Sequence, residues 1–276
     1  MSGIIRRACY FVFISLFITA LGSPVLSASS DSSSPISTGE ELIKVMFEKY
    51  KGKWYDKLTI VQKVTFYRNG EEQGSQIWTE FLDLPGKVRS NIGPVEDGNA
   101  EIYLDGEFHR FQNGKRVGGQ KAPHPVLCLG FDVYLQEPEK SIAILKEVPY
   151  DLEKIHETVW QERPVYVVGA DKDDFEPNQF WIDKEHLYFA RTIFKSPRGA
   201  VLDIEMNKIV RLGGGWIATQ LLFKRNGEII LREDYQENPI LDKIDPAVFD
   251  IENFKKLESR RCPPLRILEE TRLSGD

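Results

Sequence analysis

Residues 58–67 alternate between apolar and polar side chains with a period of two. The even positions hold Leu58, Ile60, Gln62, Val64 and Phe66, and the odd positions include Thr59, Lys63 and Thr65. This period is typical of a β-strand with one buried face. The sequence therefore predicts a β-strand over residues 58–67.

Four dipeptides mark tight turns between β-rich runs: Asn69-Gly70, Asp105-Gly106, Asn113-Gly114 and Asn226-Gly227. Asn-Gly and Asp-Gly supply the positive φ angles that two-residue hairpins require. Such hairpins join neighbouring antiparallel strands, whereas parallel strands need long crossovers. The sequence therefore predicts an antiparallel sheet.

The other elements follow from the same patterns. Beyond 58–67, strands are expected at 75–84, 87–92, 100–104, 107–112, 152–159, 164–170, 178–183, 187–195, 201–212, 216–224 and 228–236. An amphipathic helix is expected at 39–51 after the capping-box pattern that starts at Thr38, and another from Pro138. Residues 122–134 are apolar but fit neither period. Residues 38–255 contain no linker, so we expect one domain: a large, strongly curved, mainly antiparallel β-sheet with a few helices packed on it.

The two ends of the chain lie outside this domain. Arg6 and Arg7 precede an apolar run over residues 8–21, and small residues follow near Gly22, Ser27 and Ala28. This order predicts a signal peptide at 1–28, with an uncleaved anchor as the alternative. Residues 29–37 are a polar, Ser-rich linker, and residues 256–276 form a C-terminal tail. We expect an exported protein located in the periplasm.

Composition and net charge exclude several classes of chain and one class of binding partner. The chain has 276 residues, of which 41% are hydrophobic and 28% charged, with a formal net charge of −6. These values exclude disorder, collagen and coiled coil for the whole chain. The acidic balance argues against nucleic acid as a partner, because nucleic acid binding needs a basic surface.

The concave face of a curved sheet is filled by side chains or encloses a cavity. The residues expected to line it are Ile60, Val64, Phe66, Trp78, Leu82, Val88, Ile102, Phe180, Phe189 and Trp216. Plain core packing is the alternative for each of them. The face assignment of strand 75–84 stays open, because Ile77 and Phe81 lie opposite Trp78 and Leu82.

Two cysteines remain after signal cleavage, Cys128 and Cys262. In an oxidising compartment they can pair and connect the tail to the middle of the domain. Alternatively they are separate thiols, with Cys128 buried among apolar neighbours. The sequence does not decide between the two.

No pattern in the sequence points to catalysis, a metal or a cofactor. The four histidines (His109, His124, His156 and His186) are too far apart for a short zinc motif. The acidic run 171–176 lacks the register of a calcium loop and fits a solvated hairpin tip. The glycines at 213–215 fit a turn before Trp216, and no nucleophile elbow is present. We expect a protein that is not an enzyme.

Several local motifs resemble the LolA/LolB-type family of periplasmic lipoprotein carriers and related lipid-binding envelope proteins. The matching segments are Leu58–Val64 with its Gln-Lys pair, Leu84-Pro85-Gly86-Lys87-Val88-Arg89, Ile102–Phe108, Phe180-Trp181-Ile182-Asp183 and Ile244–Phe249. Their order covers nearly the whole mature chain. The resemblance implies an open half-barrel covered by helices.

The same resemblance implies a function, and at one position this chain departs from the family's pattern. It implies a monomeric carrier of acyl chains of lipoproteins or lipids, working with inner- or outer-membrane proteins and without cofactors. The alternative is an envelope interaction or stress-sensor protein that uses this fold to bind a protein partner. The family commonly has an Arg before the Pro, implicated in holding the lid closed, where this chain has Leu84. Residues 39–51 and 122–134 are the expected lid segments.

Overall fold

The computed structural model describes residues 35–254 except residue 197. The chain divides into a unit of residues 1–35 and a unit of residues 36–276, and the second unit is described below. The signal peptide expected at 1–28, most of the linker, Cys262 and the tail at 256–276 lie outside the described residues. The expectations about them stay predictions.

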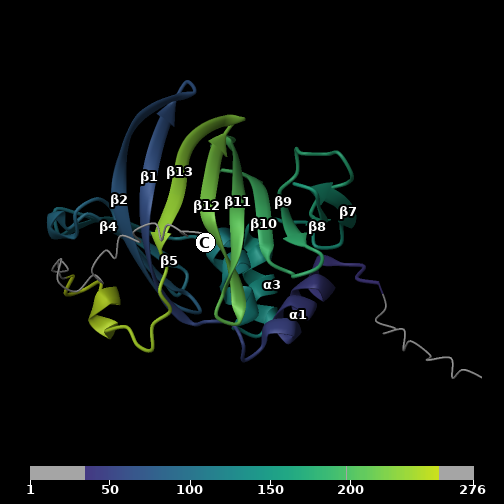
Figure 1. Ribbon diagram of the computed structural model, residues 1–276, viewed down its shortest axis with the longest axis horizontal. Helices are drawn as coiled ribbons and strands as arrows, with labels where there is room; N and C mark the ends of the chain where they lie inside the picture. The colour runs from purple at the N-terminus through teal and green to yellow at the C-terminus, as the bar shows by residue number, and fades with distance from the viewer. Residues whose placement is uncertain (1–34, 197, 255–276) are drawn as a thin grey trace, which may run out of the picture. The chain divides into compact units, whose positions relative to one another are not determined.

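One antiparallel sheet of 13 strands forms the domain, and the sheet is open. Its spatial order is β6-β5-β4-β3-β2-β1-β13-β12-β11-β10-β9-β8-β7, and its long strands bend around the helices (Figure 1). The mainly antiparallel, open and curved sheet predicted from the sequence is confirmed. The strands are β1 (Lys57–Arg68), β2 (Glu71–Asp83), β3 (Lys87–Asn91), β4 (Ala100–Leu104), β5 (Glu107–Gln112), β6 (Lys115–Lys121), β7 (Ile155–Trp160), β8 (Arg163–Val168), β9 (Gln179–Asp183), β10 (Phe189–Lys195), β11 (Val201–Leu212), β12 (Gly215–Arg225) and β13 (Glu228–Glu237).

All four predicted hairpin turns are present, and both residues of each have positive φ. The values are 53° and 79° at Asn69-Gly70, 46° and 94° at Asp105-Gly106, and 50° and 79° at Asn113-Gly114. At Asn226-Gly227 they are 52° and 83°. Positive φ at both positions gives the turn a twist that matches the strands on either side. These turns set four of the twelve pairs of neighbouring strands in the described sheet.

Helix α1 (Gly39–Tyr50) begins where the capping pattern predicts. Thr38 is the N-cap, and its Oγ1 accepts a hydrogen bond of 3.1 Å from the Glu41 backbone N–H. The Glu41 carboxylate accepts from the Ser37 backbone N–H at 2.8 Å, one residue earlier than in a standard capping box. The cap therefore satisfies two donors at the start of the helix.

The remaining helices connect the two edges of the sheet. After edge strand β6 the chain forms α2 (Pro125–Gly130), the 3₁₀ turn η2 (Asp132–Tyr134) and α3 (Pro138–Glu147), and then enters the opposite edge strand β7. This crossing passes over the face of the sheet that carries Ile60, Leu82 and Met206, here called the inner face, and α1 packs beside α3 there (Figure 1). Apolar residues of all three helices join the core on this face.

The opposite face, here called the outer face, is also covered. The segment after β13 contains η3 (Pro246–Phe249), and its Val248 and Phe249 pack with Phe81 and Ile102 in a second apolar cluster. The Arg89 guanidinium is fully buried here and donates to the Val248 carbonyl at 2.9 Å. Both faces of β2 and β4 therefore carry buried apolar side chains.

Strand β6 was not predicted. Its residues Lys115–Lys121 are exposed along the whole length and include two glycines and three basic side chains. Because pairing with β5 alone holds this edge strand, its sequence carries no apolar alternation. Among the described residues, no helix has both the length and the apolar content needed to cross a bilayer.

Candidate functional site: a cavity under a helical cover

A cavity of about 410 Å³ lies between the inner face of the sheet and the segment of residues 123–134. Its volume falls in the range of about 300–1,000 Å³ that is usual for small-molecule sites. The sheet contributes apolar side chains from β1 and from the strands that lie on either side of it. These are Ile60, Trp78, Leu82, Val88, Phe108, Phe189, Phe194, Ile204, Met206, Ile209, Trp216, Ile217, Ala218, Leu221 and Phe223.

The other wall of the cavity is the segment that fitted neither helix nor strand period. Residues 123–134, here called the cover, contribute Pro123, His124, Pro125, Val126, Leu127, Gly130, Phe131 and Tyr134. Pro125 occupies the first helical turn of α2, where its missing N–H costs nothing. The segment is too short to show a helical period, so its helix was not visible in the sequence.

His124 begins the cover. Its Nδ1 accepts a hydrogen bond of 3.2 Å from the Leu127 backbone N–H, which caps α2. Its ring stacks on Phe108, with centroids 5.2 Å apart. Burial lowers the pKa of His124 to about 4, so the imidazole is neutral at physiological pH. We therefore assign His124 a capping and packing role.

The end of the cover is held by two polar contacts. The carboxyl of Asp132, only 3% exposed, accepts a hydrogen bond of 3.1 Å from the Gly86 backbone N–H. The Tyr134 hydroxyl donates to the Leu187 carbonyl at 2.9 Å. Gly86 belongs to the Leu84-Pro85-Gly86 segment, one of those in which the sequence resembles the LolA/LolB-type family. In this chain the cover is attached to that motif by Asp132.

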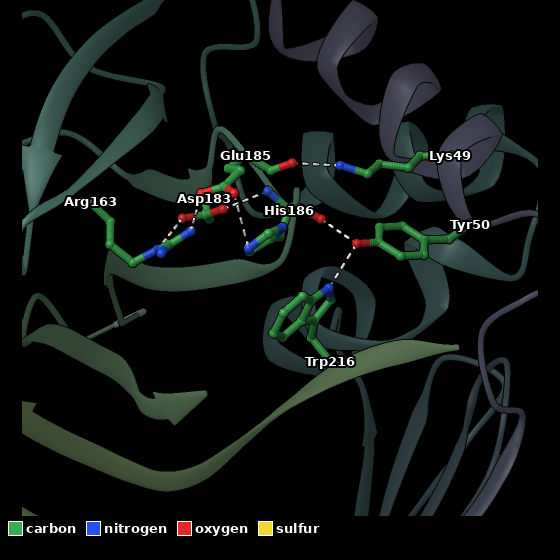
Figure 2. Close-up of polar contacts among 7 residues, drawn as sticks. All are labelled: Lys49, Tyr50, Arg163, Asp183, Glu185, His186 and Trp216. Atoms are coloured by element: carbon green, nitrogen blue, oxygen red, sulfur yellow. Dashed lines mark hydrogen bonds and ion pairs between the residues drawn. The ribbon is translucent and has the colours of Figure 1, made fainter. Parts of the chain in front are cut away.

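Helix α1, the other expected lid segment, contributes no residue to the cavity lining. Figure 2 shows how its C-terminal end is fixed to the turn between β9 and β10. Lys49 Nζ donates to the Glu185 carbonyl at 2.6 Å, and the Tyr50 hydroxyl donates to the His186 carbonyl. Trp216 Nε1 donates to the Tyr50 hydroxyl at 2.9 Å, which connects the helix to the cavity wall.

An ion-pair group stabilises the same turn (Figure 2). Arg163 Nε donates to the Asp183 carboxylate at 2.7 Å, and Asp183 also accepts from the His186 backbone N–H at 2.6 Å. Arg163 additionally contacts the Glu185 carboxylate at 3.1 Å. These contacts anchor the C-terminal end of α1 to the turn between β9 and β10. Of the two expected lid segments, only the one at 122–134 contributes to the cavity lining, through residues 123–134.

Six of the ten residues expected on the concave face line the cavity: Ile60, Trp78, Leu82, Val88, Phe189 and Trp216. The structure also settles the face of β2, because Ile77 is exposed and Phe81 lies in the outer cluster.

The other four expected residues do not line this cavity. Ile102 lies on the outer face with η3, so its assignment to the concave face was wrong. Phe180 packs in the inner-face core against the edge of the Tyr150 ring. Val64 is fully buried on β1 outside the lining, and Phe66 is half-buried beside Trp78 with ring centroids 6.2 Å apart.

The cavity wall also contains polar residues that sequence reasoning missed. Glu80, Ser90, Glu101, Glu233 and Tyr235 are among its lining residues. The place of Glu80 in the cavity wall could have been predicted, because Glu80 shares a strand face with Trp78 and Leu82. The places of Glu233 and Tyr235 could not have been predicted, since β13 shows no alternation of apolar and polar residues.

Burial and mutual repulsion act on two of these carboxyls. Burial raises the pKa of Glu80, which the hydrogen bond from Ser90 Oγ at 2.6 Å offsets in part. Burial raises the pKa of Glu233 well above its usual value, and the neighbouring charge of Glu80 raises it further. Both groups therefore favour the protonated form more than an exposed glutamate does.

The other chemical candidates have structural roles. His156 Nδ1 contacts the Ala170 carbonyl at 3.0 Å, and His186 stacks on Trp216. Across the described residues, no group of three or more His, Cys, Asp or Glu side chains is placed to hold a metal ion. Cys128 is buried in α2, and its Sγ lies 3.9 Å from the Ser141 carbonyl. Its pairing with Cys262 stays a prediction.

Gly213 and Gly214 form the turn between β11 and β12, and Gly215 is the first residue of β12. A Cβ at Gly214 would lie 2.0 Å from the Lys53 carbonyl oxygen, so only glycine allows this close approach. The turn predicted before Trp216 is confirmed.

Comparison with known proteins finds no matching family model and no matching curated protein. The fold is similar to that of a DUF1329 family protein from Desulfovibrio piger, with a TM-score of 0.54, 11% identity, and coverage of 79% of this chain and 98% of that chain. It is also similar to a proposed outer membrane lipoprotein-sorting protein domain from Vibrio parahaemolyticus, with a TM-score of 0.52, 11% identity and coverage of 77% and 96%.

A LolA superfamily protein from Nitrosomonas europaea aligns at a TM-score of 0.48 with 12% identity, covering 75% of this chain and 97% of that chain. The fold implied by the resemblance in the sequence is confirmed by the first two structures. At 11% identity the likeness is one of fold.

Proposed function

We propose that this protein is a non-enzymatic carrier of acylated cargo, lipids or the acyl chains of lipoproteins, in the bacterial periplasm. The cavity of about 410 Å³ under the cover is the observation that carries the proposal. Its lining is mainly aliphatic and aromatic, which suits a hydrocarbon chain. The signal-peptide pattern at residues 1–28 supports export, and membrane proteins would deliver and receive the cargo.

The energetics fit a carrier that must also release its load. Each buried methylene contributes about 0.8 kcal/mol, so a chain of about 15 contributes roughly 12 kcal/mol when fully desolvated. A cover that closes over the cavity in the absence of cargo competes with the acyl chain and lowers this affinity. Residues 123–134, held by Asp132 and Tyr134, are suited to that role.

The fold comparison supports the same class of function. The domain from Vibrio parahaemolyticus, whose name refers to outer membrane lipoprotein sorting, has this fold over 96% of its own length. The shared fold therefore favours acylated molecules as the kind of cargo.

A second candidate is an interaction or sensor protein in the same compartment. Edge strand β6 favours it, because Lys115–Lys121 are exposed and one side of the strand has no neighbour in the described sheet. A partner strand can add to such an edge through backbone hydrogen bonds.

Native mass spectrometry of protein isolated from its own envelope separates the two functions. A carrier gives a monomer with a bound lipid mass that disappears on extraction with organic solvent. A sensor gives a stable complex with another protein and no stoichiometric lipid, and that outcome would replace the carrier proposal.

A matched pair of variants on β2 tests the site itself. Trp78→Glu places a charge in the cavity wall and is expected to abolish uptake of a neutral fluorescent acyl ester. Ile77→Glu, at a side chain 42% exposed on the other face of the same strand, is expected to leave uptake unchanged. Equal uptake by both variants would remove Trp78 from the binding site.

A further inference from the structure

The inner face carries a polar patch formed by Gln62, Glu80 and Glu233. Glu80 pairs with Ile60 of β1 on one side, and Glu233 pairs with Val64 of β1 on the other. Gln62 lies midway between Ile60 and Val64 on β1. Since directly paired and alternate residues point to the same face, the three side chains follow one diagonal across β2, β1 and β13.

Two of these side chains are deeply buried without a partner. Glu233 is only 9% exposed and lines the cavity, yet its carboxyl makes no hydrogen bond or ion pair with any described residue. Gln62 is fully buried, and neither its amide nitrogen nor its amide oxygen has a partner within the described part of the chain. Gln62 is paired with Trp78 and Tyr235, which both line the cavity.

Buried polar groups without partners are costly and rare in native proteins. An ordinary hydrocarbon pocket has no need of them. Gln62 lies behind the cavity wall, whereas the unpaired Glu233 carboxyl is part of it. The presence of that carboxyl in a mainly apolar wall therefore points to a polar group supplied by the ligand.

The charged residues of the cavity wall indicate which polar group the ligand carries. The acidic residues of the lining are Glu80, Glu101 and Glu233, and the lining contains no Lys or Arg. Glu101 is already paired with Arg110, whose Nε donates at 2.8 Å. An anionic head would find no Lys or Arg in the lining to pair with. An ammonium group offers three donors and a positive charge, which suits the carboxyl groups of Glu80 and Glu233.

We propose that Glu80 and Glu233, the two residues of this patch that line the cavity, bind the positively charged amine of an amphiphile whose hydrocarbon part fills the rest of the cavity. The assignment rests on the proposed function and specifies the head group of its cargo. In the low dielectric of the cavity, the ion pairs are stronger than in water. The raised pKa values of the two glutamates support this assignment, because a bound cation offsets the burial and repulsion that raise them.

Three ligands with the same chain length and different heads test the assignment: dodecylamine, dodecanol and dodecanoate. Each displaces the neutral fluorescent acyl ester at neutral pH, below its micelle concentration. The amine is expected to bind about 10- to 100-fold more tightly than the acid, as charge-assisted hydrogen bonds predict. The double variant Glu80→Gln with Glu233→Gln is expected to reduce this preference to within about threefold.

The matched controls are Glu72→Gln on β2 and Glu228→Gln on β13, both at exposed positions of the same strands. They should keep the full preference for the amine. Equal binding of amine and acid by the unaltered protein, or an unchanged preference in the double variant, would overturn the assignment while dodecanol binding still supports a carrier. Failure of all three ligands and of the probe to bind would overturn the proposed function and this assignment together.

Discussion

The Asp132 carboxyl connects the cover to the sheet and titrates in an unusual range. Burial is the main cause that raises its pKa to about 7, and the Gly86 N–H donor lowers it in part. The folded protein therefore holds a proton that the unfolded chain has already lost above its ordinary pKa of 3.8. The stability contributed by this proton is present below about pH 4 and is lost as the pH rises to about 7.

Replacing Asp132 by Asn should remove this dependence. The variant is expected to gain stability relative to the parent as the pH rises from about 4 to about 7, by up to about 4 kcal/mol, because one pKa unit corresponds to about 1.4 kcal/mol. Urea unfolding across this range measures the difference. Asp173→Asn, at an exposed loop position, should show no such trend, and a flat difference for Asp132→Asn would disprove the assigned shift.

Glu233 gives a second prediction at a single side chain. Its raised pKa means that the charged form costs stability above the ordinary range of a glutamate. Glu233→Gln should therefore raise the free energy of unfolding at neutral pH by about 1–3 kcal/mol. Glu228→Gln should change it by less than about 0.5 kcal/mol. A loss of stability in Glu233→Gln would show that the carboxylate has a favourable partner.

Individual residues also show what the sequence could reveal. Alternation placed Trp78 and Leu82 on the same face of their strand but left open which face is the inner one, and the exposed Ile77 on the opposite face decides it. The same reasoning failed at Ile102, because the C-terminal segment buries the outer face as well. When both faces of a strand are buried, apolar residues no longer identify the inner one.

Among the elements, α1 and the cover have different attachments. The Tyr50 hydroxyl of α1 both donates to the His186 carbonyl and accepts from Trp216 Nε1 (Figure 2). Tyr50→Phe removes both hydrogen bonds and leaves the partly buried Trp216 Nε1–H without its acceptor. We expect a loss of about 1–3 kcal/mol in the free energy of unfolding.

Tyr67→Phe is the control, since the Tyr67 hydroxyl makes no hydrogen bond within the described residues. Its effect should stay below about 0.5 kcal/mol in thermal or chemical unfolding. Equal effects of the two variants would contradict the role of α1 as an anchor.

Helices and strands were predicted correctly where the residues themselves determine the local backbone conformation. Asn-Gly turns and the Thr38 cap determine their conformations through their own backbone requirements, so the hairpins and the start of α1 were predictable. Strand β6 and helix α2 were not, because one depends on pairing with β5 and the other on packing over the cavity. Tertiary contacts decide such elements.

For the whole molecule, the cavity volume is the property that supports function. Ala218 lines the cavity from β12, and Ala218→Trp would fill part of it. We expect this variant to lose at least about tenfold in affinity for the neutral acyl ester while remaining folded. Val210→Trp, at a side chain 43% exposed on β11, should bind as the parent does. Unaltered affinity in Ala218→Trp would place the ligand elsewhere.

The architecture of the whole sheet was predictable from turns and alternation, and so were six of the lining residues. The cavity itself was not, because it depends on how far the cover stands from the sheet. Its acidic patch depends on strand register that brings Glu80 of β2 and Glu233 of β13 to the two sides of Gln62.

Photo-crosslinking measures directly whether the cavity holds an acyl chain. The protein is loaded with an acyl ester that carries a diazirine near the end of its chain, irradiated, digested and mapped by mass spectrometry. Adducts on inner-face residues such as Leu221 and Phe223 and on Phe131 of the cover are the expected result. Adducts confined to the outer face or to edge strand β6, or no adducts at saturating ligand, would contradict an acyl-binding cavity.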